Sequence, residues 1–277
     1  MKRSSIIAFI TLLLIACNNE EVIQQETWDV VLSRTATNGQ HVKVVGKKNG
    51  TKKLDGVLIP SSSENEAAQW KGEKPSWPEN ENLEMFVISP IPEGNEIPQS
   101  VHVNDGQTWM IDYLPSCYKP NQFTLTHLMA KLKVHIRISN DENHQQPKNV
   151  KMTLYTEAEI DYSGKKLKNH SGKNEKNVSL GDFSKDDNAE EGSDNWTCND
   201  ILIIPQILEK GKVCLIFTDS NGKEYTFTPE KDLTLLPGKV SHLFLGIAMD
   251  QLIFLGDGVA ITPWVSETSN SGNAEEE

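Results

Sequence analysis

Apolar and polar residues alternate along much of this chain with a period of two. The clearest stretch is 131–138, where one set of alternate side chains is apolar and the other is basic: Leu132, Val134, Ile136 and Ile138 against Lys131, Lys133, His135 and Arg137. Successive side chains of a strand point to opposite faces, so this pattern predicts a strand with one buried and one solvated face. Such a half-solvated strand is typical of an antiparallel sheet.

Other short apolar segments predict further strands, while helical spacing is hardly visible. The predicted ranges are 42–45, 54–59, 83–88, 109–113 and 123–125 in the first half, and 150–155, 201–204, 213–217, 225–227, 233–236 and 240–247 in the second. Turn sequences such as Asp219-Ser220-Asn221-Gly222 and Pro237-Gly238 separate neighbouring segments. Many short strands joined by such turns predict an all-β fold built of β-sandwiches.

Polar stretches divide the chain. Residues 140–148 read as a linker between two domains, which we place at 35–147 and 148–266. Residues 163–195 read as a long surface loop of the second domain, although Val178, Leu180 and Phe183 could form one more strand there. The acidic tail 267–277 has no apolar side chains to bury, which predicts disorder.

The N-terminal residues have the pattern of a signal peptide. Lys2 and Arg3 precede an apolar run, 6–16, that would span only about half of a ~30 Å hydrocarbon core as a helix. Leu14-Ile15-Ala16-Cys17 resembles a lipobox, so we interpret residues 1–17 as a lipoprotein signal region that is cut before Cys17, with lipid attached to Cys17. The polar stretch 18–21 resembles the tag that sends some bacterial lipoproteins to the outer face of the outer membrane.

Charge and cysteine usage exclude several classes of protein. A formal net charge of -12 and a pI near 5.1 argue against nucleic acid as a partner, because its phosphates require a basic surface. Without Cys17 an odd number of cysteines remains, none with CxxC spacing, so no disulfide framework is implied. Cys214 lies in an apolar segment and is interpreted as a buried structural thiol.

Motifs for catalysis, cofactors and metal ions are missing from the sequence. The seven histidines show no HExxH or paired metal-ligand spacing, and we interpret His127 as a packing or hydrogen-bonding residue. The acidic run 186–194 departs from a calcium loop in the place of its glycine and lacks the closing glutamate, so we interpret it as a solvated loop. Trp70 and Trp77 either stack on a sugar or pack against the protein, and packing is favoured. We expect no enzyme and no cofactor.

Several segments together resemble the fimbrillin family, the type V pilus subunits of Bacteroidales and their tip-like relatives. These segments are Ser33-Arg34-Thr35-Ala36-Thr37, the strand-like stretch 123–132 with His127 at its centre, Ile203-Ile204-Pro205-Gln206, Leu236-Pro237-Gly238-Lys239 and Ile261-Thr262-Pro263-Trp264. The resemblance implies two tandem transthyretin-like β-sandwich domains, delivery to the outer membrane as a lipoprotein, and assembly with other pilus subunits by strand exchange.

The resemblance also implies a processing site near the N-terminus. In relatives, an Arg-specific surface protease cuts after an arginine, the first strand leaves, and the groove accepts a strand from a neighbour. Arg34 and Thr35 match the two sides of that cut, at the end of a leader 18–34. The segment before the cut is apolar and β-prone, so Trp28, Val30 and Leu32 would belong to the released strand. Its loss would leave unpaired strand edges for a donor strand to fill.

The donor strand is less well defined, and the sequence leaves two functions open. The segment 251–264 contains Leu252, Phe254, Val259 and Ile261, and it is either a donor strand or the last strand of its own domain. Only a polar tail follows, which favours a tip or accessory subunit over a stalk subunit. The alternative is a monomeric surface lipoprotein that binds a glycan or a host protein through its loops.

Overall fold

The structure is a computed structural model that describes residues 28–33, 40–61, 66–103, 106–139, 147–179, 183–186, 193–248 and 251–264. Within these residues the chain is all-β, and its helical content is one short 3-10 turn, η2 (Glu93–Asn95). No helix in the described part of the chain has the length and apolar character needed to cross a membrane. The all-β fold predicted from the alternation of side chains is therefore confirmed.

The first half of the chain forms an eight-stranded sheet. Its strands are β1 (Val30–Ser33), β2 (Val42–Lys48), β3 (Thr51–Ile59), β4 (Ala67–Trp70), β5 (Leu83–Ser89), β7 (Met110–Cys117), β8 (Gln122–Thr124) and β9 (Thr126–His127). They follow the order β8-β1-β4-β3-β2-β5-β7-β9, so the first strand of the chain lies between β8 and β4. All neighbours in this sheet are antiparallel except β1 and β8, which run parallel.

The second half, together with β6 from the first half, forms an eleven-stranded sheet that curls on itself. Its strands are β6 (Ser100–His102), β10 (Ala130–Ser139), β11 (Pro147–Asp161), β12 (Lys166–Ser179), β13 (Phe183–Asp186), β14 (Ser193–Cys198), β15 (Ile201–Ile203), β17 (Leu215–Asp219), β18 (Glu224–Phe227), β20 (Lys239–Ala248) and β21 (Gln251–Pro263). The main order is β12-β11-β17-β18-β21-β20-β10-β14-β13. A separate pair consists of β16 (Ile207–Leu208) and β19 (Leu233–Thr234).

The predicted strands are found where the alternating pattern placed them. In β10 the four apolar side chains are at most 3% exposed, while the basic side chains between them are partly exposed. The inward residues of this sheet form one core cluster with Leu154, Phe217 and Leu243 among its members. The first sheet has its own cluster, which contains Val30, Leu58 and Phe123.

The prediction of a loop over 163–195 is wrong. Strand β12 pairs with β11 from Asn149↔Ser179 to Asp161↔Lys166 and makes a long hairpin. Residues 168–172 are exposed, so no apolar alternation marks this strand in the sequence. The strand exists because its backbone pairs with β11 and because polar side chains meet across the hairpin, as Asn169 and Glu159 do at 2.7 Å.

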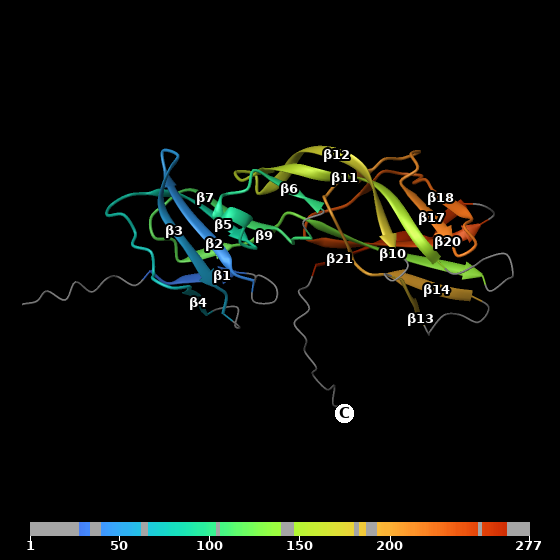
Figure 1. Cartoon of the computed structure of the whole chain (residues 1–277), viewed down its shortest axis with the longest axis horizontal. Coiled ribbons are helices and arrows are strands. Elements are labelled where there is room, and N and C mark those ends of the chain that lie inside the picture. The colour runs from blue at the N-terminus through green and yellow to red at the C-terminus, as the bar shows by residue number, and fades with distance from the viewer. Residues whose placement is uncertain are drawn as a thin grey trace, which may run out of the picture.

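A third core cluster joins the two halves of the molecule. It combines Phe86 and Ile111 of the first sheet with Ile160 and Tyr162 at the end of the β11–β12 hairpin. Strand β6 pairs with β11 at the same place, and Figure 1 shows the hairpin arching from the second sheet toward the first. The buried carboxylate of Asp112 also accepts a hydrogen bond from Lys165 in the hairpin turn, at 2.5 Å.

Sheet membership changes early in the chain. Strand β9 belongs to the first sheet, whereas β10 pairs with β14, β15 and β20 of the second. Apart from β6, which pairs with β11, the change therefore falls between His127 and Ala130, ahead of the polar stretch 140–148. The division of the chain into domains 35–147 and 148–266 remains a prediction.

Candidate functional site

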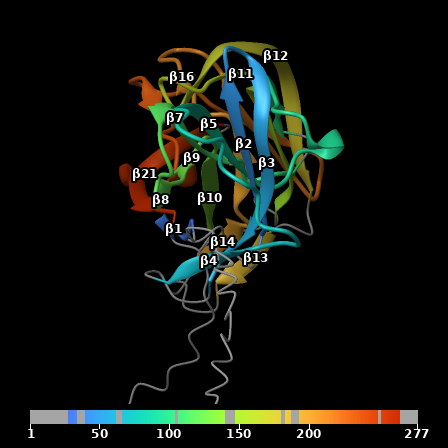
Figure 2. The same ribbon diagram turned by 90° about the vertical axis from the view of Figure 1, so that its left-hand side faces the viewer.

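The first described strand, β1, fills a slot between two other strands of its sheet. It is antiparallel to β4, with Val30 opposite Ala68, and parallel to β8, with Leu32 opposite Phe123. In Figure 2 the labels β8, β1 and β4 follow one another along the side of the first sheet. We call this space, bounded by β4 and β8, the β1 slot.

The inward side chains of the β1 segment alternate along the chain and are all buried. Trp28 is 5% exposed, Val30 is fully buried and Leu32 is 4% exposed. Asp29 points outward and makes an ion pair with Lys74 at 3.2 Å. The three apolar residues predicted to belong to a released strand thus pack into the core of the first sheet.

An aromatic cluster lies at the start of the β1 slot. The Trp28 ring lies 5.1 Å from that of Trp70 and 4.9 Å from that of Trp77, and Trp77 contacts Tyr118 at 5.9 Å. The indole N–H of Trp28 donates to the carbonyl of Pro120 at 2.6 Å. Trp70 and Trp77 therefore pack against Trp28, which supports the packing interpretation of these two residues.

The processing and lipidation residues lie outside the described part of the chain. This holds for Cys17, Arg34 and Thr35, and so their roles remain predictions. In the sequence, Arg34 follows directly after Ser33, the last residue of β1. A cut after Arg34 would therefore separate β1 from β2 without removing any residue of either strand.

The segment considered as a donor, β21, forms part of the second sheet. It pairs with β20 over most of its length and with β18 at its start. Leu252 is buried, and Phe254 and Val259 pack against the core cluster of this sheet. Ile261 is 49% exposed and faces away from that core. In this structure β21 is a strand of its own sheet.

The end of β21 is held by residues from the other family-like segments. The Trp264 ring stacks on His127 at 4.5 Å and 13°, and the ammonium of Lys131 lies 4.5 Å from the same ring. The backbone N–H of Trp264 donates to the carbonyl of Gly238 at 3.0 Å, and the backbone N–H of Gly238 donates to the carbonyl of Met129 at 2.9 Å. Three segments distant in sequence thus meet at one point, which we call the Trp264 clasp.

The clasp also explains two of the motif residues. His127 is 7% exposed and stacked, so its predicted packing role is confirmed. Gly238 has φ +65°, and a β-carbon there would lie 3.4 Å from the β-carbon of His127. A residue at this position must adopt a left-handed conformation close to the histidine, which favours glycine. Sequence reasoning found both motifs but had no signal that would place them side by side.

Among the described residues, Cys117, Cys198 and Cys214 are free thiols. Burial raises the pKa of the Cys198 thiol to about 11 and that of Cys214 to about 12. Cys198 accepts a hydrogen bond from the backbone N–H of Val134 at 3.1 Å. Protonated, buried thiols are poor nucleophiles and metal ligands, as expected of structural cysteines.

No metal cluster is built from three or more His, Cys, Asp or Glu side chains within the described residues. The acidic run 186–194 lies mostly outside these residues, because 187–192 are not described. Its interpretation as a solvated loop remains a prediction.

Comparison with known proteins identifies the family. A family model described as fimbrillin-like matches residues 29–264. The chain belongs to the fimbrillin-like family. The match begins just before β1 and ends at Trp264, so it includes both the β1 slot and the Trp264 clasp. The family resemblance predicted from the sequence motifs is confirmed.

Solved structures from Bacteroides and Porphyromonas species are similar to this chain. A candidate cell adhesion protein from Bacteroides uniformis has a TM-score of 0.58 and 12% identity, over 86% of this chain and 98% of that chain. A second candidate cell adhesion protein, from Bacteroides ovatus, has a TM-score of 0.50 and 11% identity; the match covers 86% of this chain and 96% of the B. ovatus chain. The tip fimbrial protein Mfa3 from Porphyromonas gingivalis has a TM-score of 0.43 and 13% identity, over 84% and 98%. Comparison with curated proteins finds no match.

Membership of the family establishes the general role of the fimbrillin-like chain. The family consists of fimbrial and adhesion proteins of the cell surface and is not a class of enzymes. The protein is therefore a pilus or adhesin subunit.

Proposed function

We propose that this protein is a subunit of a cell-surface fimbria and that it joins a neighbouring subunit by strand exchange at the β1 slot. A surface protease cuts after Arg34, β1 leaves, and a donor strand of another subunit takes its place between β4 and β8. The observation that carries this proposal is the position of β1, an apolar strand inserted between two others and followed at once by an arginine.

Cutting the chain weakens the hold of the slot on β1. Full burial of an aliphatic or aromatic side chain contributes about 1.5–3 kcal/mol, so Trp28, Val30 and Leu32 together contribute about 5–9 kcal/mol. Association of two separate molecules costs about 4–15 kcal/mol in lost translational and rotational freedom. The intact chain avoids this cost because β1 is tethered to β2. After cleavage the two terms are of similar size, so β1 can leave and a donor strand with more buried contacts can replace it.

The vacated slot would accept a donor of a particular chemistry. Strand edges of β4 and β8 offer backbone hydrogen bonds, and alternate side chains of the donor must fill an aromatic pocket and two aliphatic positions. In the same proposal β21 stays in its sheet, because it is paired on both sides at its start and fixed by the Trp264 clasp at its end. The donor strand is then supplied by a neighbour.

Export as a lipoprotein belongs to this proposal as well. The signal peptide 1–17, a lipid on Cys17 and an outer-membrane location would bring the subunit to the surface where the protease acts. Lipid anchoring there keeps the protein close to other subunits until it is cut.

Cleavage followed by peptide binding tests the proposal. The sequence holds three arginines, Arg3, Arg34 and Arg137, and Arg137 lies within β10, where pairing protects it. Purified protein without residues 1–17 is treated with an Arg-specific protease and analysed by mass spectrometry and size exclusion. We expect one cut, after Arg34, together with a red shift of tryptophan fluorescence as Trp70 and Trp77 lose contact with Trp28.

A labelled peptide with the sequence of residues 26–33 then reports whether the slot is open. It should bind the cut protein and not the uncut protein, and a peptide with Trp28→Ala should bind at least about tenfold more weakly. The matched control is Arg34→Lys, which keeps the charge but resists the protease. A protein that is cut after Arg34 yet keeps β1 and never takes up the peptide would contradict strand exchange.

A further inference from the structure

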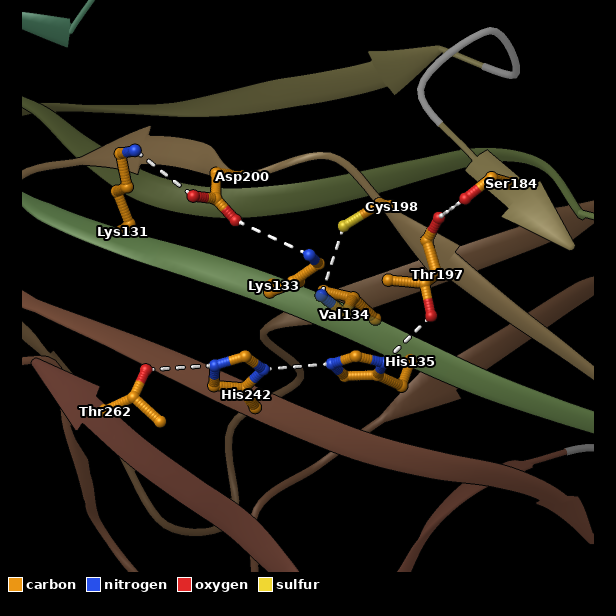
Figure 3. Close-up of polar contacts among 10 residues, drawn as sticks. All are labelled: Lys131, Lys133, Val134, His135, Ser184, Thr197, Cys198, Asp200, His242 and Thr262. Atoms are coloured by element: carbon orange, nitrogen blue, oxygen red, sulfur yellow. Dashed lines mark hydrogen bonds and ion pairs between the residues drawn. The ribbon is translucent and has the colours of Figure 1, made fainter. Parts of the chain in front are cut away.

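Two histidines from adjacent strands meet on the solvent face of the second sheet. Strands β10 and β20 run parallel, with His242 opposite Lys133 and Phe244 opposite His135. Nε2 of His135 lies 3.1 Å from Nδ1 of His242, as Figure 3 shows. The two residues are 107 positions apart, so the fold alone brings them together.

The outer nitrogen of each ring faces a threonine hydroxyl. Nδ1 of His135 lies 2.9 Å from Oγ1 of Thr197 on β14, and Nε2 of His242 lies 3.2 Å from Oγ1 of Thr262 on β21. Phe244 stacks on His135 at 4.5 Å and 14°, which fixes the plane of that ring. A threonine hydroxyl therefore orients each imidazole through its outer nitrogen, while the inner nitrogens of the two rings face each other.

We propose that His135 and His242 form a binding site for a divalent transition-metal ion of the zinc, copper or nickel type. Imidazole nitrogens bind these ions at about 2.0–2.1 Å. An ion at that distance from two nitrogens 3.1 Å apart makes an angle of about 100° between them, close to the value of neighbouring ligands in tetrahedral or square-planar sites. The two rings lie end to end, so each would turn by about 40° from the line that joins the two nitrogens to aim its lone pair at one ion.

The protons of the pair can be placed without a conflict. In the metal-free pair one ring must donate its inner N–H to the lone pair of the other. When an ion takes the place of that proton, His135 carries its hydrogen on Nδ1 and donates to Thr197, and His242 carries its hydrogen on Nε2 and donates to Thr262. The threonine beside the ring that donated its inner N–H changes from hydrogen-bond donor to acceptor by rotating its hydroxyl. Metal-bound histidines commonly have such a partner on the outer nitrogen.

The basic side chains on this face are engaged elsewhere. Lys131 and Lys133 point to Asp200, at 3.1 and 4.0 Å (Figure 3). Burial and the nearby charge of Lys133 lower the pKa of His242, and the carboxylate of Asp200 offsets part of that charge. The Nε–H of Arg137 donates to Asn195 at 3.2 Å. The two rings are partly exposed, so water supplies the other ligands, in keeping with the lack of a third His, Cys, Asp or Glu ligand within the described residues.

A bound ion would join four strands of the second sheet through the two rings and their threonines: β10, β20, β14 and β21. Ligands that bind only the folded state raise its stability by mass action. At a zinc concentration about 100 times the dissociation constant, we expect the melting temperature to rise by about 5 °C.

Calorimetric titration with zinc chloride tests the site. The whole protein, purified without a histidine tag, is titrated near neutral pH in a non-chelating buffer. We expect one ion per chain, with affinity at least about tenfold lower in His135→Gln and in His242→Gln. His41→Gln is the matched control and should bind zinc like the wild type. NMR should show the largest nitrogen shifts at Nε2 of His135 and Nδ1 of His242.

Two further variants keep the test decisive if a histidine variant fails to fold. Thr197→Val and Thr262→Val retain both ligands but remove the outer partners, and each should weaken zinc binding about tenfold. The melting temperature of each variant without zinc checks its fold. The proposal is overturned if the wild type binds no zinc at about 1 mM, or if zinc shifts other side chains and these variants leave its affinity unchanged. Neither result depends on strand exchange at the β1 slot.

Discussion

At the residue scale, Trp28 holds the first strand in place. Its ring contacts Trp70 and Trp77, and its N–H donates to Pro120. Replacing a buried tryptophan by alanine removes its apolar contacts and leaves a cavity. We expect Trp28→Ala to lower the free energy of unfolding by about 3 kcal/mol in urea titrations. Asp29→Ala, next to it on the outward face, should change the free energy by less than about 0.5 kcal/mol.

Asp55 on β3 gives a prediction about pH. Burial raises its pKa, but hydrogen bonds from Lys43 and Lys52 outweigh that effect, so the pKa lies below its usual value. A carboxyl group with a lowered pKa stabilises the fold above the pKa of the unfolded chain, and this contribution is lost as pH falls through the folded value. Because water screens this partly exposed carboxylate, Asp55→Asn should cost only about 1 kcal/mol at neutral pH and progressively less below about pH 4. An equal loss at every pH would contradict this assignment.

Single residues also show the limits of sequence reasoning. The sequence identified Trp28, Val30 and Leu32 as a strand and His127 as a packing residue, because short local patterns are enough for both. It offered no link between His135 and His242, since their meeting depends on two parallel strands from distant parts of the chain. Trp70 and Trp77 were visible as aromatic residues, but only the fold shows that they surround Trp28.

At the element scale, strands with one apolar face were predictable and purely polar strands were not. Strand β10 has strict alternation and was found at nearly its true length. Strand β12 carries exposed polar side chains over 168–172, so its backbone pairing with β11 is its main determinant. Short strands such as β4 and β6 were also missed, because two or three alternating residues do not make a pattern.

The Trp264 clasp predicts how the last strand is held. Without the indole ring, the end of β21 loses its stack on His127 and its contact with Lys131, while the start of the strand keeps its pairing with β18 and β20. In Trp264→Ala, backbone amides over 259–263 should exchange hydrogen at least about tenfold faster, and those over 252–254 should not change. Uniform acceleration along the strand would show that the clasp does not act locally.

At the scale of the whole molecule, the shared core should make the two halves unfold together. The third core cluster and the β6–β11 pairing place residues of both halves in one packed unit. We expect a single calorimetric transition whose calorimetric and van't Hoff enthalpies agree.

A variant at the junction should separate the two halves. Tyr162 is 9% exposed, contacts Phe86 and donates to the Pro98 carbonyl at 2.8 Å. Tyr162→Ala should cost about 3–5 kcal/mol and split the transition into two. Tyr118→Ala, at a ring that is 48% exposed, serves as the control and should leave one transition. Two transitions in the wild type would contradict a shared core.

The direction of β1 has a consequence for any filament built from this subunit. Because β1 is parallel to β8 and antiparallel to β4, a donor strand that reproduces these hydrogen bonds enters the slot in the direction of β1. Each joint would then set the next subunit in the same orientation as the one before. Such a fibre has polarity: its two ends present different surfaces, so growth and attachment can be assigned to opposite ends.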